Sequence, residues 1–385
     1  MIEKLRLLSV LAAVGFAVAD TAAAADQKNI YIVGQDLDGL RGYYKSGCCI
    51  APNGTTAYLS LYSLLDQTKN FGGLGVNRTL KPFKNERGWG SGPVSAWTTA
   101  TAFGVDHLAI GLSITEDTEP DGLLRIGAGT FDPEIKHLAR FAKATGKVVL
   151  LRIGYEFDGH WNAGYGKTKA YVAAWRHIAA IMRSENATNV QFVWQSSTSP
   201  IDDILDGHHE DIGAWYPGDD VVDWVGASWF LPPDDQGASI SHGSNSVTMR
   251  PLMDEAVQFA RLHKKPVMIA ELAPQGFDLK RRTRRNISPI WDGPSGQGIR
   301  KLSDNAIWQQ WYQPFFDYLK ANDDVIDAIA YINVNWDSQP MWGPPYANGY
   351  WGDSRLETNA VISTRWNAAI TSWRDIDRKP GRKTR

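Results

Sequence analysis

Strand-length apolar runs alternate with amphipathic helical segments along almost the whole chain, and this alternation restricts the fold more than any other feature. Eight runs have the character of strands: 29–33, 56–62, 107–113, 147–153, 190–194, 222–228, 267–270 and 326–334. The run Val148–Leu151 is apolar at every position, as expected for a parallel strand covered on both faces. Eight strand–helix units joined by right-handed connections close into a barrel. We therefore predict an α/β protein with a single-domain (β/α)₈ (TIM barrel) fold.

The helical segments between these runs have recognisable ends. From Ile135 to Ala142 the apolar residues recur with a helical period. Asp132 is predicted to cap the start of this helix, with Pro133 in its first turn. Gly146 stands where a helix commonly ends, directly before the fourth strand. The pattern thus supports a regular succession of strand and helix.

The first residues have the composition of a secretory signal. Lys4 and Arg6 precede an apolar run over 7–19, and Ala23–Ala25 offers a small-residue cleavage site. The run is shorter than the ~20 residues that cross a membrane as a helix. We therefore divide the chain into a signal peptide (1–25), a barrel domain (26–373) and a basic tail (374–385), and expect a secreted or periplasmic protein without a membrane span.

Composition excludes several classes of function. A net charge of −2 favours neither nucleic acid nor a membrane surface as a partner. Cys48 and Cys49 are adjacent, so a vicinal disulfide and two free thiols both stay open, and a zinc site has no support from their spacing. Motifs for nucleotide loops or a serine hydrolase are also missing from the required contexts. We predict no metal and no cofactor, and expect a monomer.

Two of the strand runs end in a glutamate, Glu156 after the fourth and Glu271 at the seventh. Strands four and seven lie on opposite sides of an eight-stranded barrel, so the two carboxylates would face each other across its mouth. Such a pair is the apparatus that cleaves a glycosidic bond, with a separation of ~5–5.5 Å for retention and ~6.5–9.5 Å for inversion. We predict retention, with Glu271 as nucleophile. Glu156 would be the general acid/base, its pKa raised by burial and by its negative neighbour.

The segment RIGYEFDGHWN, which spans Arg152–Asn162, resembles the strand-four signature of glycoside hydrolase family 26, a β-mannanase family built on (β/α)₈ barrels. The resemblance implies the same roles for Glu156 and Glu271. It also implies that Trp336, after the eighth strand, forms the floor of the subsite for the cleaved sugar. Two positions depart from the family pattern, because Tyr155 replaces a usual histidine and Trp229 stands where the sixth strand often ends in tyrosine. Mannan, mixed-linkage β-glucan and β-1,3-xylan therefore all stay open as substrates.

Further residues near these strand ends are predicted to bind the polysaccharide. Arg152 either supports a catalytic carboxylate or forms a structural ion pair inside the barrel. Trp161 and Trp336 are the preferred platforms for sugar rings, because large flat apolar rings stack on sugar faces, and Trp229 is a weaker one. The other candidates are Tyr155, Asp158 and Asn162. For Asp158 the alternative is orientation of its own loop, and for Asn162 it is a hydrogen bond within its own turn.

Three competing interpretations remain. His208–Asp211 is rich in ligand-type side chains but lacks the spacing of a metal site. The basic run Lys280–Arg285 is either a solvated loop or an extension of the cleft toward an anionic polysaccharide. A secreted carbohydrate-binding protein without turnover would also fit the barrel, although the two glutamates oppose it. The sequence thus predicts a β-mannanase-like, endo-acting glycoside hydrolase whose partner is a polysaccharide.

Overall fold

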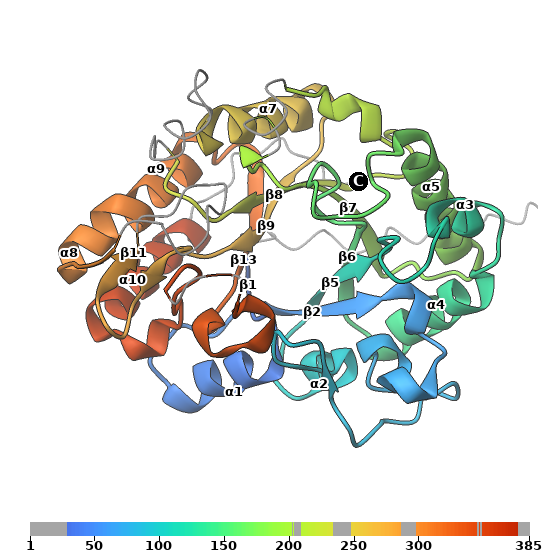
Figure 1. The fold of residues 1–385 in the computed structure, drawn as a ribbon, viewed down its shortest axis with the longest axis horizontal. Helices are drawn as coiled ribbons and strands as arrows, with labels where there is room; N and C mark the ends of the chain where they lie inside the picture. Colours follow the sequence, from blue (N-terminus) through green and yellow to red (C-terminus); the bar gives the residue numbers. More distant parts are fainter. Residues whose placement is uncertain are drawn as a thin grey trace, which may run out of the picture.

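The computed structural model describes residues 29–201, 203, 209–233, 248–285, 298–344, 346 and 349–375. At its centre is a closed barrel of parallel strands, with the order β1-β13-β9-β8-β7-β6-β5-β2 around the ring (Figure 1). The barrel strands are β1 (Ile30–Val33), β2 (Gly54–Ser60), β5 (His107–Ser113), β6 (Val148–Ile153), β7 (Val190–Ser196), β8 (Trp224–Trp229), β9 (Val267–Leu272) and β13 (Ile326–Tyr331). Each predicted run overlaps one of them, so the predicted TIM barrel is confirmed.

Helices surround the barrel on all sides (Figure 1). They are α1 (Leu37–Ser46), α2 (Ala96–Thr101), α3 (Gly122–Gly127), α4 (Asp132–Thr145), α5 (Thr168–Ser184), α7 (Met249–Leu262), α8 (Asp304–Ile307), α9 (Gln313–Ala321) and α10 (Ala360–Arg374). Helix α4 ends at Gly146, whose φ of 64° is left-handed as predicted. Its N-cap is Phe131 instead of Asp132, so the helix starts one residue earlier than the sequence indicated.

The apolar core has two parts, separated by the wall of the barrel. A small cluster inside the barrel includes Ile32, Leu150 and Ala328, whereas a much larger one lies between the strands and the helices. Most of the described tryptophans are buried, and many of them belong to the outer cluster. Inward and outward side chains alternate along the strands, so one residue of displacement decides whether a side chain meets the barrel interior or the helices.

Strand β9 breaks this alternation immediately before its end. Met268 and Ala270 face the interior, while Ile269 faces the helices. The pairing with β8 then shifts, because Ala227 is opposite Ile269 but Ser228 is opposite Glu271. Such a bulge changes the direction of the following side chain. As a result Glu271 turns inward directly after Ala270, although strict alternation would have pointed it at the helices.

Several predictions concern regions outside the active face. The signal peptide and residues 376–385 of the basic tail lie outside the described residues, while Arg374 is the last residue of α10. Cys48 and Cys49 form a vicinal disulfide, which resolves the choice between disulfide and thiols. Within the described ranges, no helix has the length and hydropathy of a membrane span.

Candidate active site

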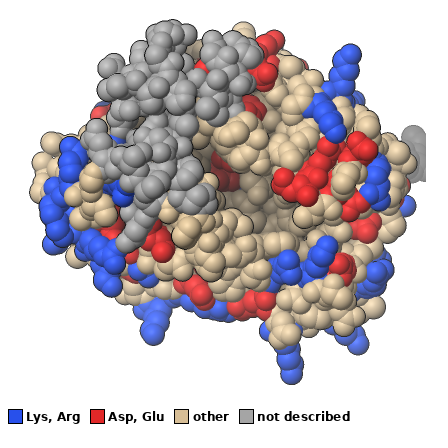
Figure 2. Space-filling view, in the orientation of Figure 1, with Lys and Arg blue, Asp and Glu red and all other residues tan. Residues whose placement is uncertain are grey.

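A pocket opens at the carboxyl ends of the barrel strands. It has a volume of about 450 Å³, and both Glu156 and Glu271 lie in its wall. Figure 2 shows a hollow in the middle of this face, with acidic side chains inside it. Much of the remaining wall is aromatic and comes from Trp161, Phe230, Trp336, Trp342, Tyr346, Tyr350 and Trp351. We call this cavity the barrel pocket.

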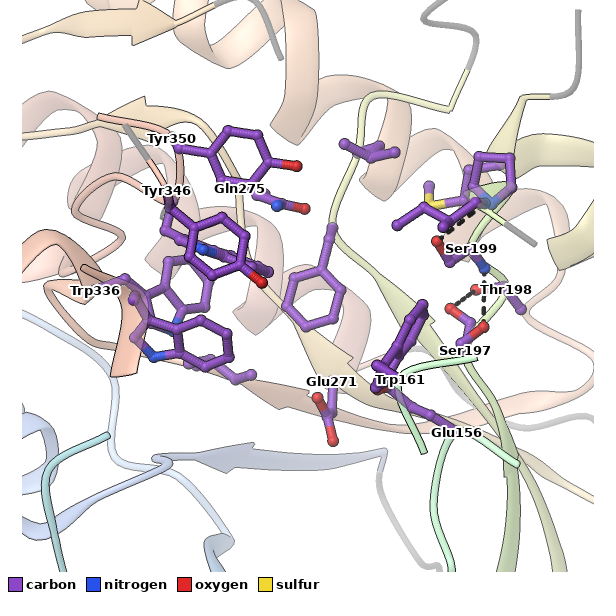
Figure 3. A pocket seen from close by; sticks show the side chains of 18 of the residues that line it. Glu156, Trp161, Ser197, Thr198, Ser199, Glu271, Gln275, Trp336, Tyr346 and Tyr350 are labelled. Atoms are coloured by element: carbon purple, nitrogen blue, oxygen red, sulfur yellow. Dashed lines mark hydrogen bonds between the residues drawn. The ribbon is translucent and has the colours of Figure 1, made fainter. Parts of the chain in front are cut away.

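The two glutamates stand on neighbouring parts of the pocket wall. In Figure 3 the side chain of Glu271 lies between that of Trp336 on one side and those of Trp161 and Glu156 on the other. Trp161 is 40% exposed, whereas Trp336 is buried within the aromatic wall. The structure therefore brings together both carboxylates and both tryptophans that were predicted as sugar platforms.

Glu156 is held in a strained backbone conformation at the end of β6. Its φ of 54° is in the left-handed region, which costs a residue with a side chain ~1–3 kcal/mol. The Asn162 amide donates a hydrogen bond to the Glu156 carbonyl oxygen at 2.7 Å. The carboxylate accepts hydrogen bonds from Trp161 Nε1 at 3.0 Å and from Ser228 Oγ at 2.8 Å. These contacts hold the strained residue with its carboxylate in the pocket wall.

The protonation of Glu156 is governed by its surroundings. Burial, together with the negative charge of Glu271, raises the pKa of Glu156 well above its ordinary value. The hydrogen bonds from Ser228 and Trp161 favour the carboxylate and oppose this rise. A carboxyl group with such a raised pKa can stay protonated near neutral pH and give its proton to a leaving group.

Glu271 forms a buried ion pair with Arg152. The guanidinium donates a hydrogen bond from Nη1 to Glu271 Oε1 at 2.7 Å, and the Arg152 side chain is fully buried. Both alternatives predicted for Arg152 are therefore combined, because the pair lies inside the barrel and also supports a carboxylate of the pocket. The positive charge compensates for removing Glu271 from water. The two glutamates thus have different environments, because Glu156 is buried beside a negative charge and Glu271 is paired with a buried cation.

Tyr155 does not line the barrel pocket, although we predicted it to bind substrate. The Arg152 guanidinium carbon lies 5.3 Å from the Tyr155 ring centroid and 4.8 Å from that of Tyr58. The two rings also contact each other edge to face at 5.5 Å. Gly154 and Glu156, on either side of Tyr155, both have left-handed φ values of 51° and 54°. This local path directs Tyr155 toward the buried cation instead of the pocket.

Asp158 and Asn162 hold loops in place, which is the alternative given for each of them. The Asp158 carboxylate accepts hydrogen bonds from the Ser196 hydroxyl and from the Ser197 backbone N–H, the latter at 2.6 Å. It thereby ties the loop after β6 to the end of β7. Asn162 donates to the carbonyl oxygen of Glu156, as described above. Neither residue lines the barrel pocket, so their predicted contact with sugar has no support in the structure.

The prediction that Trp229 binds sugar is contradicted. Its ring is fully buried in the outer core and lies 5.4 Å from the Phe315 ring and 5.1 Å from the Tyr318 ring. The residue before it, Ser228, faces inward and reaches Glu156. The prediction for Trp229 therefore assumed the wrong face of β8. Neighbouring side chains along a strand point to opposite faces, so Trp229 faces the helices while Ser228 faces the barrel interior.

The sequence analysis missed several polar residues of the site. Ser197 and Thr198, which follow β7, lie in the wall of the barrel pocket together with Gln35 and Gln275. Ser228 and Gln195 lie below the wall and connect the two carboxylates through hydrogen bonds. A signal existed for these two, since each is a polar residue at an inward position of an apolar strand.

The remaining clusters have local partners. His209 contacts Asp203 at 2.7 Å and Glu255 at 2.8 Å, whereas His208 lies outside the described residues. Among the residues that the structure places, no group of His, Cys, Asp and Glu side chains could hold a metal ion. In the basic run, Arg281 pairs with Asp278 at 3.4 Å and Arg282 with Asp304 at 2.7 Å. The run includes the short strand β11 (Thr283–Arg285), which pairs with β10 (Phe277–Asp278) and β12 (Ile299–Lys301).

Replacing Arg152 by methionine should lower the free energy of unfolding by about 3–5 kcal/mol, because it leaves the buried Glu271 charge without its partner. Urea unfolding followed by tryptophan fluorescence measures this loss. The matched control is Arg261→Met, which removes a partly exposed pair with Asp324 at 2.7 Å and should cost at most about 1 kcal/mol. Equal losses in the two variants would contradict the role of burial.

Sequence comparisons relate the chain to xylan-degrading enzymes. It is 30% identical over 357 residues to a β-1,3-xylanase from a Vibrio species, an alignment that covers 91% of the chain and 66% of that relative. A β-1,3-xylanase from an Alcaligenes species is 29% identical over 343 residues, with 88% of the chain and 62% of the relative covered. The chain thus spans somewhat less than two thirds of the length of these curated relatives. In a scan of protein-family models, no model matches the chain.

Structural comparisons relate the fold to mannanases. The structure of a family 26 β-mannanase from Bacteroides ovatus superposes with a TM-score of 0.52 at 12% sequence identity, covering 93% of this chain and 95% of that one. The catalytic domain of a family 26 endo-β-1,4-mannanase from a Bacillus species gives a TM-score of 0.50 at 15% identity, with 91% and 90% covered. At such identities the likeness concerns the fold. The chain thus has the fold of glycoside hydrolase family 26, the family that its strand-four segment resembles.

Proposed function

We propose that the chain hydrolyses a β-linked polysaccharide by a retaining mechanism, and that β-1,3-xylan is its substrate. The central support is the unequal pair of carboxylates in one aromatic pocket. Glu156 has a raised pKa, and Glu271 is bound to the buried Arg152. The choice of β-1,3-xylan over β-mannan rests on the names of the two curated relatives, since the mannanases share the fold alone at low identity.

In the first step of this mechanism, Glu271 attacks the anomeric carbon while protonated Glu156 gives its proton to the leaving oxygen. The aromatic wall around Trp161 and Trp336 provides faces on which sugar rings stack. The bond to the leaving sugar breaks as the bond to the Glu271 oxygen forms. A glycosyl ester on Glu271 and a free sugar chain end are the products of this step.

In the second step Glu156, now a carboxylate, removes a proton from water as the water attacks the anomeric carbon. Esterified Glu271 no longer carries a negative charge. The contribution of that charge to the high pKa of Glu156 disappears with it. The same carboxyl group therefore holds a proton to give before the ester forms and is ionised, ready to accept one, afterward. This alternation matches the order in which the two roles are needed.

The N-terminal segment supports a proposal about the compartment in which the reaction takes place. An export signal over residues 1–25 would deliver the barrel to the periplasm or the outside of the cell, where polysaccharides are met as polymers. Endo action, which cuts inside a polymer, is part of the same proposal.

The decisive experiment is product analysis of the purified chain on β-1,3-xylan, β-1,4-mannan, mixed-linkage β-glucan and an acidic exopolysaccharide. We expect xylo-oligosaccharides of several lengths from β-1,3-xylan and little from the others. Oligosaccharides from mannan alone would move the specificity to mannan. Binding to a polysaccharide without release of any sugar would instead favour the carbohydrate-binding protein. Preference for the acidic polymer would support the interpretation that the basic run Lys280–Arg285 extends the substrate cleft.

The pH dependence of kcat/KM should have an alkaline limb set by Glu156. Its raised pKa means that the folded enzyme keeps the catalytic proton above the pH at which an ordinary glutamate loses it. Activity should therefore fall as the pH rises through the pKa of Glu156. The stability that accompanies the bound proton is also fully present at low pH and is lost over the same rise. A kcat/KM profile with an alkaline midpoint at the ordinary glutamate value would refute this expectation.

A further inference from the structure

We propose that Gln195 and Ser228 are positioning residues that fix the direction of the hydrogen bond to Glu156 Oε1 and thereby favour the carboxylate form of this acid/base. This inference rests on the proposed function and deepens it. It starts from a chain of hydrogen bonds inside the barrel. Arg152 Nη1 donates to Gln195 Oε1 at 3.0 Å, Gln195 Nε2 donates to Ser228 Oγ at 3.0 Å, and Ser228 Oγ donates to Glu156 Oε1 at 2.8 Å. Arg152 also binds Glu271, so the chain joins the two carboxylates below the pocket.

The direction of every hydrogen bond in this series follows from the Arg152 guanidinium group. A guanidinium group has donors and no acceptor, so the Gln195 atom facing Arg152 must be the amide oxygen. The amide nitrogen then faces Ser228 and can only donate. The Ser228 oxygen is thus used as an acceptor, and its single proton is left for Glu156. Gln195 and Ser228 are buried, so bulk water does not compete for these groups.

The direction of the last bond determines which form of Glu156 it favours. Glu156 Oε1 accepts the Ser228 proton at 2.8 Å, and Oε2 accepts from Trp161 Nε1 at 3.0 Å. Each oxygen therefore already has a donor, and a proton on either of them must share that oxygen with a second hydrogen. A hydrogen bond to an ionised carboxylate is stronger than one to a neutral carboxyl group. The directed bond from Ser228 thus favours the carboxylate form of Glu156.

Other charged and titratable groups surround Glu156, and the test must separate them from Ser228. They are Glu271 on β9, Arg152 on β6, and Tyr155, Asp158 and His160 on the same loop as Glu156. Substitution of Ser228 changes none of these charges. It removes one neutral donor to the carboxylate, and its effect can be attributed to that bond.

The test uses the full chain with Ser228→Ala, and it measures the ionisation of Glu156 directly. In protein labelled with ¹⁵N-tryptophan, the indole N–H signal of Trp161 reports the charge on Glu156 Oε2, and the signal is assigned by its loss in Trp161→Phe. Loss of the Ser228 donor disfavours the carboxylate, so the titration midpoint should rise by about one pH unit. The alkaline limb of kcat/KM should move in the same direction. A midpoint equal to that of the unaltered chain would overturn the proposal.

Two further variants keep the test decisive. Gln195→Met preserves side-chain length but removes both bonds, so the Ser228 hydroxyl can rotate and a smaller rise is expected. If Ser228→Ala does not fold, Gln195→Met takes its place in the test. Ser363→Ala is the matched control, because Ser363 is a buried serine on α10 that bonds only within its own helix. It should leave the midpoint unchanged, and an equal rise there would also overturn the proposal. A shifted midpoint in a chain that hydrolyses no glycan would refute the proposed function alone.

Discussion

Replacing Glu271 by alanine should lower kcat on β-1,3-xylan roughly 10⁴-fold or more, since loss of a nucleophile removes the covalent route altogether. The polysaccharide should still bind, because the aromatic wall of the barrel pocket is unchanged. Added azide or formate can occupy the space of the missing carboxylate and attack the anomeric carbon from the same side. The resulting product should have the inverted anomeric configuration. Nuclear magnetic resonance of the products measures this configuration, and reducing-sugar release measures the rate.

The control for Glu271→Ala is Glu134→Ala, which changes a half-buried glutamate in the first turn of α4, outside the barrel pocket. That variant should keep full activity. Glu271→Ala protein that still cleaves xylan at a tenth of the original rate would exclude a nucleophilic role for this carboxylate. Inverted product from the unaltered enzyme would instead point to a water-filled gap between the two carboxylates and to a single-step mechanism.

Replacing Glu156 by alanine should have an effect that depends on the leaving group. On xylan, whose leaving alkoxide needs a proton, the rate should fall about 10²–10⁴-fold. On an aryl xyloside with an acidic phenol, formation of the glycosyl ester needs little help. The second step then becomes limiting, and a burst of phenol should precede slow turnover. Azide should accelerate this variant and give a product with retained configuration.

The comparison of the two alanine variants assigns the roles. An inverted azide product from Glu271→Ala together with a retained one from Glu156→Ala would identify Glu271 as nucleophile and Glu156 as acid/base, and the exchanged pair of configurations would reverse these roles. The same configuration from both variants, or an equal loss of rate by Glu156→Ala on xylan and on the aryl xyloside, would remove this assignment. Trp229→Phe serves as the control for a large buried change near the site, and its rate losses should be equal on both substrates.

The sequence was sufficient to predict the barrel and the two strand ends whose glutamates lie in the pocket. Eight apolar runs of strand length, with helices between them, leave few alternatives to a closed barrel. The positions of Glu156 and Glu271 at ends of the fourth and seventh strands follow from the same count. The family resemblance added roles to these residues, and the pocket contains both of them.

The directions of individual side chains were beyond the sequence. Trp229 was assigned to the pocket and Ser228 was overlooked. Alternate residues of β8 point to opposite faces, but the sequence does not show which set faces the barrel interior until the neighbouring strands are known. Asp158 and Asn162 are polar residues next to a catalytic position, and the sequence could not show that backbone groups would take up their hydrogen bonds. The left-handed φ of Glu156 is likewise set by its contacts with Asn162, Trp161 and Ser228. The contacts of Ser228 and Asp158 depend on segments that are distant along the chain, whereas those of Asn162 and Trp161 with Glu156 lie within one loop.

The extra residue in β9 has a consequence for how this protein can change in length. Deleting Ala270 would restore regular pairing with β8, and Glu271 would then point inward by ordinary alternation after the outward Ile269. Inserting a residue at the same place would rotate Leu272 out of the outer core, where it is fully buried. Single-residue insertions should therefore be tolerated beyond Pro274, where the chain leaves the barrel, and should prevent folding between Ile269 and Leu272. Deletion of Ala270 should be tolerated better than an insertion at the same place. A library of single-residue length variants across 265–280, sorted for folding and for turnover, would draw that boundary.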